Sequence, residues 1–183
     1  MSHGIDSSRS FRPLGIAVLT VSDSRTLADD QSGDLLIQRL RDSGHRLVER
    51  QIVTDDVSLI QEQLRDWVMW DQVQVILTTG GTGVTGRDVT PEAVTGISDK
   101  HIPGFGELFR QLSFASIGVS AIQSRALAAL SGTTYIFALP GSTGACRDAW
   151  DEILVNQLDN RFRPCNFVEI MPRLQEHVQQ RIK

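Results

Sequence analysis

The chain has 183 residues, a length typical of one domain, with 40% hydrophobic and 22% charged residues. This balance excludes a long disordered chain, a collagen and a coiled coil. The 18 basic and 22 acidic residues give a formal net charge of −4, so electrostatic binding to nucleic acid or to an anionic membrane is not expected. We expect one domain over residues 13–170, a flexible tail over 1–12 and a C-terminal tail over 171–183.

The chain carries two cysteines, Cys146 and Cys165, and four scattered histidines. Two cysteines are too few for a disulfide framework, and neither residue type shows the spacing of a metal site. The polar N-terminus lacks the apolar stretch of a signal peptide, and no apolar run approaches the roughly 18 residues of a membrane span. We therefore expect a soluble, cytoplasmic protein with reduced thiols.

The N-terminal half alternates between strand and helix patterns. A continuous apolar run predicts a buried strand over 14–21, and leucines at helical spacing predict a helix over 31–42. Residues 46–53 alternate like a more exposed strand, and 57–68 carry an amphipathic helical stripe. A third strand is expected over 73–78.

The C-terminal half continues this alternation. Thr90 followed by Pro91 marks the start of a helix. The further predicted elements are a helix over 107–114, a helix over 120–130, a strand over 133–139 and a helix over 145–158. No strand is expected around 100–106.

Alternating strands and helices predict a three-layer α/β/α sandwich around a mostly parallel sheet. In such sheets, ligands bind beyond the carboxyl ends of the strands. Two glycine-containing turns, at 79–86 and 140–144, each follow a predicted strand. Both turns should therefore lie at the ligand-binding edge of the sheet.

The two turns have the composition of phosphate-binding loops. Glycine lets backbone N–H groups approach an anion closely, and the N-terminus of a following helix adds its dipole. The 140–144 turn leads into a predicted helix, so its amides and the Ser142 and Thr143 hydroxyls suit a phosphate. An ordinary tight turn with a helix cap is the alternative.

Residues 81–86 match the pattern G-x-G-x-x-G of dinucleotide-binding proteins, but their context differs. That pattern should open a helix directly and lead to an acidic residue at a strand end about 20 residues later, and neither is predicted here. Arg87 and Asp88 also stand where a P-loop has Lys and Ser or Thr. We reject a nicotinamide site and a P-loop, and keep an oxyanion-binding turn.

Two acidic residues adjoin this predicted edge: Asp88 follows the glycine turn and Asp55 follows the second predicted strand. A carboxylate beside a phosphate is unfavourable unless a cation lies between them, and Mg²⁺ is held by one or two carboxylates plus substrate phosphates. Asp88 therefore suits a Mg²⁺ ligand in phosphoryl or nucleotidyl transfer. Alternatively, Asp88 pairs with Arg87 or caps its loop, and Asp55 caps the next helix. Arg125 fits either a buried ion pair or a phosphate clamp.

Five motifs in this order resemble the MoaB/MogA family of molybdenum cofactor biosynthesis proteins. They are LTTGGTG at 77–83, DVTPEA at 88–93, PGFGE at 103–107, SRA at 124–126 and LPGS at 139–142. The resemblance runs from about Leu14 to Glu169, and the ending at 161–167 is closer to the MoaB branch than to MogA.

The resemblance implies a three-layer α/β fold that binds molybdopterin, a pterin with a dithiolene and a terminal phosphate. Active members use Mg²⁺ and ATP to adenylylate this phosphate, releasing pyrophosphate, and a molybdenum insertase then uses the product. By motif, the phosphate sites of the nucleotide and the pterin would be lined by Thr79, Gly80, Gly81, Thr82, Gly83, Pro140, Gly141 and Ser142. Asp55 and Asp88 would be the acids required for the reaction, with Asp88 as a metal ligand.

The resemblance also implies a homo-oligomer, either a trimer or a hexamer. This chain keeps Asp55 and reads GRDVTP over 86–91, the form of active members. We therefore expect a molybdopterin adenylyltransferase. The alternative is a non-catalytic molybdopterin carrier or assembly protein of the same pathway, which has no need to hold Mg²⁺ with these acids.

Overall fold

A six-stranded sheet forms the centre of the computed structural model, which describes residues 4–176. The strand order is β3-β2-β4-β7-β6-β5. The strands are β2 (Gly15–Val21), β3 (Arg46–Val53), β4 (Val75–Thr79), β5 (Lys100–His101), β6 (Leu127–Ser131) and β7 (Thr134–Leu139). The strands β3, β2, β4 and β7 run parallel, whereas β6 runs antiparallel to both of its neighbours. The predicted mostly parallel sheet is confirmed.

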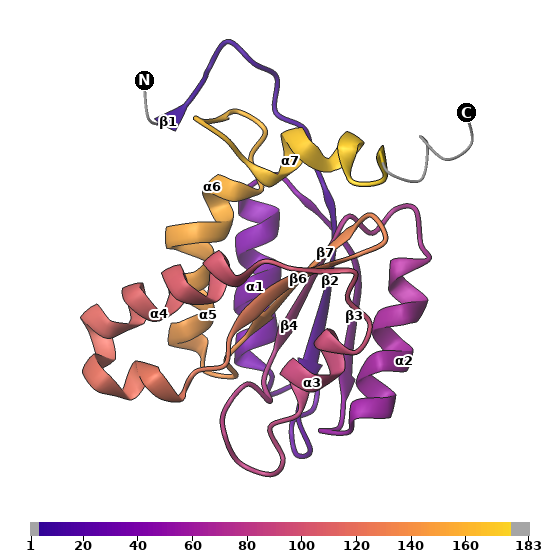
Figure 1. Ribbon diagram of the computed structural model, residues 1–183, viewed down its shortest axis with the longest axis vertical. Helices are drawn as coiled ribbons and strands as arrows, with labels where there is room; N and C mark the ends of the chain where they lie inside the picture. The colour runs from indigo at the N-terminus through magenta and orange to yellow at the C-terminus, as the bar shows by residue number, and fades with distance from the viewer. Residues whose placement is uncertain (1–3, 177–183) are drawn as a thin grey trace.

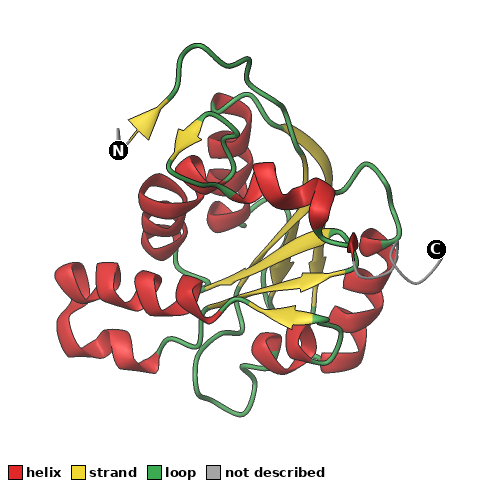
Figure 2. Cartoon of the chain, turned by 45° about the horizontal axis from the view of Figure 1, so that its top comes forward, coloured by secondary structure: helices red, strands yellow, loops and turns green. Residues whose placement is uncertain are grey.

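Helices cover both faces of this sheet (Figures 1 and 2). One face carries α1 (Gln31–Asp42), α4 (Pro103–Ile117), α5 (Thr143–Ala149) and α7 (Phe167–Ile170). The other face carries α2 (Val57–Val68) and α3 (Thr90–Thr95). The helix α5 continues through a π-helical segment, Trp150–Leu154, into α6 (Val155–Gln157). The three-layer architecture expected from the sequence is therefore confirmed.

The strands β2, β4 and β7 are buried along their whole length. Ile16 and Val18 of β2 belong to the core beneath α1 and α5. Ala17 and Leu19, which alternate with them, belong to the core beneath α2 and α3. A strand covered on both faces needs apolar residues at every position, which explains its continuous apolar sequence.

Asp30 connects α1 to the sheet. Its fully buried carboxylate accepts hydrogen bonds from the Thr20 hydroxyl at 2.6 Å, from the Gly33 amide at 3.0 Å and from Arg50 at 3.0 Å. Burial opposes ionisation, but these three donors outweigh it and lower the pKa of Asp30. The chain leaving β2 is thereby held to both β2 and β3.

The helix expected over 120–130 was wrong. Gly118–Gln123 form a short 3-10 helix, η1, and Leu127–Ser131 form β6. The alanine-rich stretch favours a helix locally, but it pairs with β7 across a two-residue turn in which Gly132 has a φ of 59°. Tertiary pairing has overridden local preference. The expected absence of a strand around 100–106 was also wrong, because β5 pairs with β6 there.

Residues near both ends of the chain contact each other. The strand β1 (Gly4–Ile5) pairs antiparallel with β8 (Phe162–Arg163), and Arg9 forms an ion pair with Glu169. A 3-10 helix, η3 (Met171–Arg173), follows α7. The tails predicted at 1–12 and 171–183 include residues 1–3 and 177–183, which lie outside the described residues. Among residues 4–176, no helix combines the length and apolar character needed to cross a membrane.

His45 is a buried titratable group in this fold. It packs between Phe11 and Trp150, with ring centroids 5.1 and 6.3 Å away, and its Nδ1 accepts the Leu14 amide at 3.2 Å. Burial lowers the pKa of His45 from 6.5 to about 4, and the nearby Asp159 carboxylate opposes this shift. The folded protein therefore holds His45 in its neutral form.

This shift predicts a pH-dependent stability. Between about pH 6.5 and pH 4 the unfolded state binds a proton that the folded state excludes, so the free energy of unfolding falls as the pH falls. The full loss is roughly 3 kcal/mol at one charged histidine. Urea denaturation across this range should show the loss in the wild type and in His101→Gln, which changes an exposed histidine, but not in His45→Gln. An unchanged slope in His45→Gln would contradict the assignment.

Candidate functional site

The four parallel strands all end at one edge of the sheet, the lower edge in Figure 1. The loop after β2 contains Asp23, the turn after β3 contains Asp55, and the loop after β4 contains the glycine turn at 79–83. The turn at 140–142 follows β7. The sequence-predicted residues therefore lie on neighbouring connections, as expected for parallel strands.

The glycine turn passes very close to the end of β2. Gly80 and Gly81 have φ values of 105° and 64°, a backbone conformation that residues with a side chain rarely adopt. A Cβ atom on Gly80 would lie 2.2 Å from the Val21 carbonyl oxygen, and one on Gly81 would lie 2.9 Å from an Asp55 carboxylate oxygen. The absence of side chains at both positions allows the loop to reach Asp55.

The two predicted phosphate turns meet. The Thr79 hydroxyl donates to the Pro140 carbonyl at 3.0 Å, and the Gly80 amide donates to the Leu139 carbonyl at 3.1 Å. Cys146 lies beneath this junction, with its Sγ 3.2 Å from the Thr79 hydroxyl, and burial raises the pKa of its thiol to about 11. A neutral, packed thiol is consistent with a supporting role.

Ser142 caps the helix that follows the second turn. Its Oγ accepts the Ala145 amide at 3.3 Å, so the helix-cap alternative does describe this side chain. Arg25 holds the same turn from the loop after β2, because its guanidinium donates to the Gly141 carbonyl at 3.0 Å and to Ser32 at 2.6 Å.

Arg125 fixes the glycine loop from outside. Its amide donates to the Thr82 carbonyl at 2.9 Å, and its guanidinium donates to the carbonyls of Gly83 and Asp88 and pairs with Glu92. Its nitrogens are thus engaged by loop carbonyls and one carboxylate. Arg125 is therefore an ion-pair partner, but the pair is not the buried one expected, because the two side chains are 33% and 53% exposed.

Asp55 does not cap the next helix. The neighbouring Asp56 does so, because its carboxylate accepts the amides of Ser58 and Leu59. Asp55 lies beside Gly81 instead. Its pKa is raised, first by burial and then by the negative charges of Asp23 and Asp88, with Arg87 opposing. The helix-cap alternative for Asp55 was wrong.

The Asp88 carboxylate, unlike that of Asp55, is held by hydrogen bonds within its own loop. Its carboxylate accepts the amide and the hydroxyl of Thr85 at 2.9 and 2.6 Å, so the loop-cap alternative holds for this residue. The Thr85 hydroxyl is the main cause of its lowered pKa, and burial opposes the shift. The alternative that Asp88 pairs with Arg87 was wrong, because Arg87 reaches Asp23. Asp88 is therefore a stable anion at neutral pH.

Asp23 was missed by sequence reasoning. Its carboxylate accepts the Asp55 amide at 3.1 Å and pairs with Arg87. The signal was available, since Asp23 follows a buried parallel strand just as Asp55 follows its own strand. An acid in that position belongs to the same edge of the sheet.

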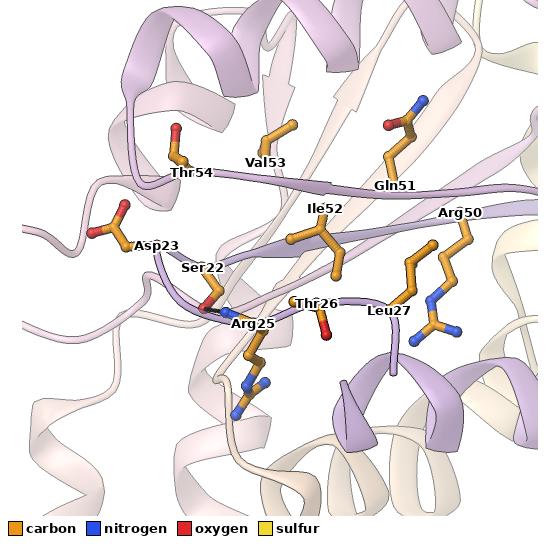
Figure 3. Close-up of a pocket in the computed structure, with 10 residues that line it drawn as sticks. All are labelled: Ser22, Asp23, Arg25, Thr26, Leu27, Arg50, Gln51, Ile52, Val53 and Thr54. Carbon is orange, nitrogen blue, oxygen red and sulfur yellow. Dashed lines mark hydrogen bonds between the residues drawn. The ribbon is translucent and has the colours of Figure 1, made fainter. Parts of the chain in front are cut away.

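Two grooves adjoin these residues. The first has a volume of about 380 Å³ and lies between the loop after β2 and the end of β3, where Figure 3 shows Asp23 and Thr54 at one end and Arg50 at the other. The second, of about 390 Å³, is lined by residues 84–86 and 88–89 of the loop after β4 together with Glu92 of α3 and Arg125. Asp23 lines the first groove and Asp88 lines the second.

No cluster of three His, Cys, Asp or Glu side chains within residues 4–176 is arranged to hold a metal ion. Mg²⁺ sites on nucleotide enzymes commonly take one or two carboxylates and complete their shell with water and phosphate oxygens. Asp55 and Asp88 suit such a site, because Asp55 is partly buried and the charges of Asp23 and Asp88 add to burial in raising its pKa. A bound cation would offset these charges.

Comparison with known proteins identifies the family. Residues 17–160 match the family described as a probable molybdopterin binding domain. A protein of Escherichia coli strain K12, molybdenum cofactor biosynthesis protein B, is 49% identical over 160 residues, covering 87% of this chain and 94% of that protein. The chain belongs to the molybdopterin-binding family of molybdenum cofactor biosynthesis proteins.

Solved structures agree with this assignment. A crystal structure of molybdenum cofactor biosynthesis protein B superposes with a TM-score of 0.83 at 38% identity, covering 92% of this chain and 99% of that chain. The MoaB protein of Thermus thermophilus superposes with a TM-score of 0.69 at 32% identity, covering 77% of this chain and 89% of that chain. The MoaB/MogA resemblance is confirmed. This MoaB-like protein therefore acts in molybdenum cofactor biosynthesis.

The glycine turn yields a stability prediction. Gly80→Ala should lower the free energy of unfolding by roughly 2–4 kcal/mol, because the new Cβ meets backbone and requires an unfavourable φ. Gly86→Ala is the matched control, since a Cβ there has no atom within 4 Å. Urea denaturation of both variants compares them. Equal stability of the two variants would show that the turn can shift away from β2.

Proposed function

We propose that this MoaB-like protein adenylylates molybdopterin. The terminal phosphate of the pterin attacks the α-phosphorus of ATP. A new oxygen–phosphorus bond forms, the bond between the α-phosphorus and the bridging oxygen breaks, and its electrons leave with pyrophosphate. The proposal is supported by one observation above all: Asp55, free of any helix-capping role, is held against Gly81 with a raised pKa and Asp88 nearby.

The protein residues supply positioning and charge rather than proton transfer. The attacking phosphate is already anionic, so the step needs no general base. The backbone amides of 81–82 and 141–142 suit the phosphates of the two substrates, because their turns meet at Thr79 and Pro140. Holding both phosphates at one junction makes the reaction effectively intramolecular.

Asp55 and Asp88 would hold Mg²⁺ together with phosphate oxygens, and the ion would neutralise the charge that develops on the leaving pyrophosphate. Thr85 keeps Asp88 ionised for this role by donating two hydrogen bonds to one carboxylate oxygen. Asp55 gains most from a cation, because burial and two neighbouring carboxylates now raise its pKa.

A non-catalytic molybdopterin carrier is the second candidate. It is favoured by the hydrogen bonds of Asp88, which satisfy its carboxylate within its own loop. In the catalytic proposal the adenylylated product passes to a molybdenum insertase. In the carrier alternative, the protein delivers molybdopterin itself.

The catalytic proposal predicts product from Mg·ATP and molybdopterin, measured as pyrophosphate and as AMP-linked pterin. Asp88→Asn should lower turnover by about 10²-fold, the scale of losing one electrostatic contact to a transition state, while pterin binding is largely retained. Asp66→Asn, an exposed acid on α2, is the matched control.

Three outcomes separate the proposals. Product that disappears in Asp88→Asn supports adenylylation. Pterin binding without product in the wild type supports the carrier. Equal loss of turnover and pterin binding in Asp88→Asn would assign that residue to the structure of the pocket.

We also propose a homo-oligomer, a trimer or a hexamer, as the family resemblance implies. The helix α4 and the segment after it extend away from the sheet (Figure 1) and expose Phe114, Ile117, Val119 and Ile122, which are 59%, 56%, 79% and 84% exposed. An apolar surface of this kind is typical of subunit contacts.

Sedimentation velocity tests the oligomer. The wild type should sediment as a trimer or hexamer, and Ile122→Asp should shift it toward monomer, because a buried charge without a partner is costly. Met69→Asp, at an 81% exposed position after α2, should leave the size unchanged. A monomeric wild type would overturn the proposal.

A further inference from the structure

We infer that Arg87 binds the polyphosphate of the ligand and that Asp23 holds its guanidinium until the ligand arrives. Binding would then transfer the guanidinium from Asp23 to the phosphates. The inference deepens the proposed function, on which it rests in one respect only: the ligand of the site carries a polyphosphate.

Arg87 and Asp23 form an ion pair with several hydrogen bonds. The Arg87 guanidinium donates from Nε to one Asp23 oxygen at 2.9 Å and from Nη2 to both Asp23 oxygens at 2.6 Å. The two side chains are 65% and 45% exposed. Water and salt screen exposed pairs of this kind, so they contribute little net stability and exchange readily for another anion.

The ion pair joins two loops at the binding edge of the sheet. Asp23 belongs to the loop after β2 and Arg87 to the loop after β4, and the Asp23 carboxylate also accepts the amide of Asp55. Asp23 lines the first groove, while Gly86 and Asp88, the neighbours of Arg87, line the second. The ion pair therefore connects the linings of the two grooves.

The arginines near the site differ in how firmly their guanidinium groups are held. Arg25 and Arg125 are held by backbone carbonyls and further side chains. Arg50 is held by Asp30 and Asp34. Among the arginines placed near the site in residues 4–176, Arg87 is the one whose guanidinium is held by a single exposed side chain.

The Arg87 guanidinium can bind a phosphate with the same donors that it now gives to Asp23. A guanidinium presents its donors as a planar fork that binds carboxylate and phosphate in the same bidentate manner. Asp23 thus occupies the donors that a phosphate would use. When Arg87 leaves, the Asp23 carboxylate faces the phosphates unpaired, beside the amide of Asp55. Asp23 therefore opposes the binding of polyphosphate that carries no metal.

The test is calorimetric titration with inorganic tripolyphosphate at low salt, in the presence of EDTA. Asp23→Asn should bind it about fivefold more tightly than the wild type, the upper range for releasing an exposed ion pair. Arg87→Gln should bind it more weakly than the wild type, and the affinity of Arg87→Lys should lie between those of Arg87→Gln and the wild type. Asp66→Asn, which removes the same charge from α2, should match the wild type.

The double variant Asp23→Asn/Arg87→Gln decides the mechanism. It should bind like Arg87→Gln, because the gain from losing Asp23 acts through Arg87. A gain that persists in the double variant would assign the effect to net charge and overturn the inference. Unchanged or weaker binding in Asp23→Asn, or no binding by any of these proteins, would also overturn it. The adenylylation assay is independent of these outcomes, since the titration contains neither ATP nor molybdopterin.

Discussion

The approach of the glycine turn to the end of β2 is the constraint on which the site depends. Gly80 lies so close to the Val21 carbonyl that no Cβ fits, and this brings Gly81 against the Asp55 carboxylate. The second turn joins through Thr79 and Pro140. The turns that follow two strands and a carboxylate that follows a third therefore converge on one small region. Parallel topology makes this convergence possible, because all of these strands end at the same edge.

Electrostatics gives the region its chemical character. Asp23, Asp55 and Asp88 bring negative charge to an edge where the turns suit anions, and Arg87, paired with Asp23, offsets part of this charge. Like charges so placed are stable only with a counterion. We propose two sources of this counterion, the Arg87 guanidinium and a metal bound to phosphate. An exchange between the two would couple ligand binding to the pairing of Asp23.

Much of this could be predicted from the sequence, where local pattern and tertiary environment agree. The apolar run of β2 and the paired glycine turns indicated the sheet and its binding edge. The 120–130 segment could not be read locally, because its alanines favour a helix and only pairing with β7 makes Leu127–Ser131 a strand. The roles of Asp55 and Asp56 also needed coordinates, since adjacent acids after a strand are equal candidates for the helix cap.

We propose that substrate phosphates and a metal ion meet at Asp55 and the glycine turn. A crystal structure with Mn²⁺ and a non-hydrolysable ATP analogue tests this most directly, because anomalous scattering locates the metal. We expect a metal peak within coordination distance of Asp55 or Asp88, with the triphosphate along residues 79–83. A nucleotide bound elsewhere, or a metal that contacts neither carboxylate, would contradict it.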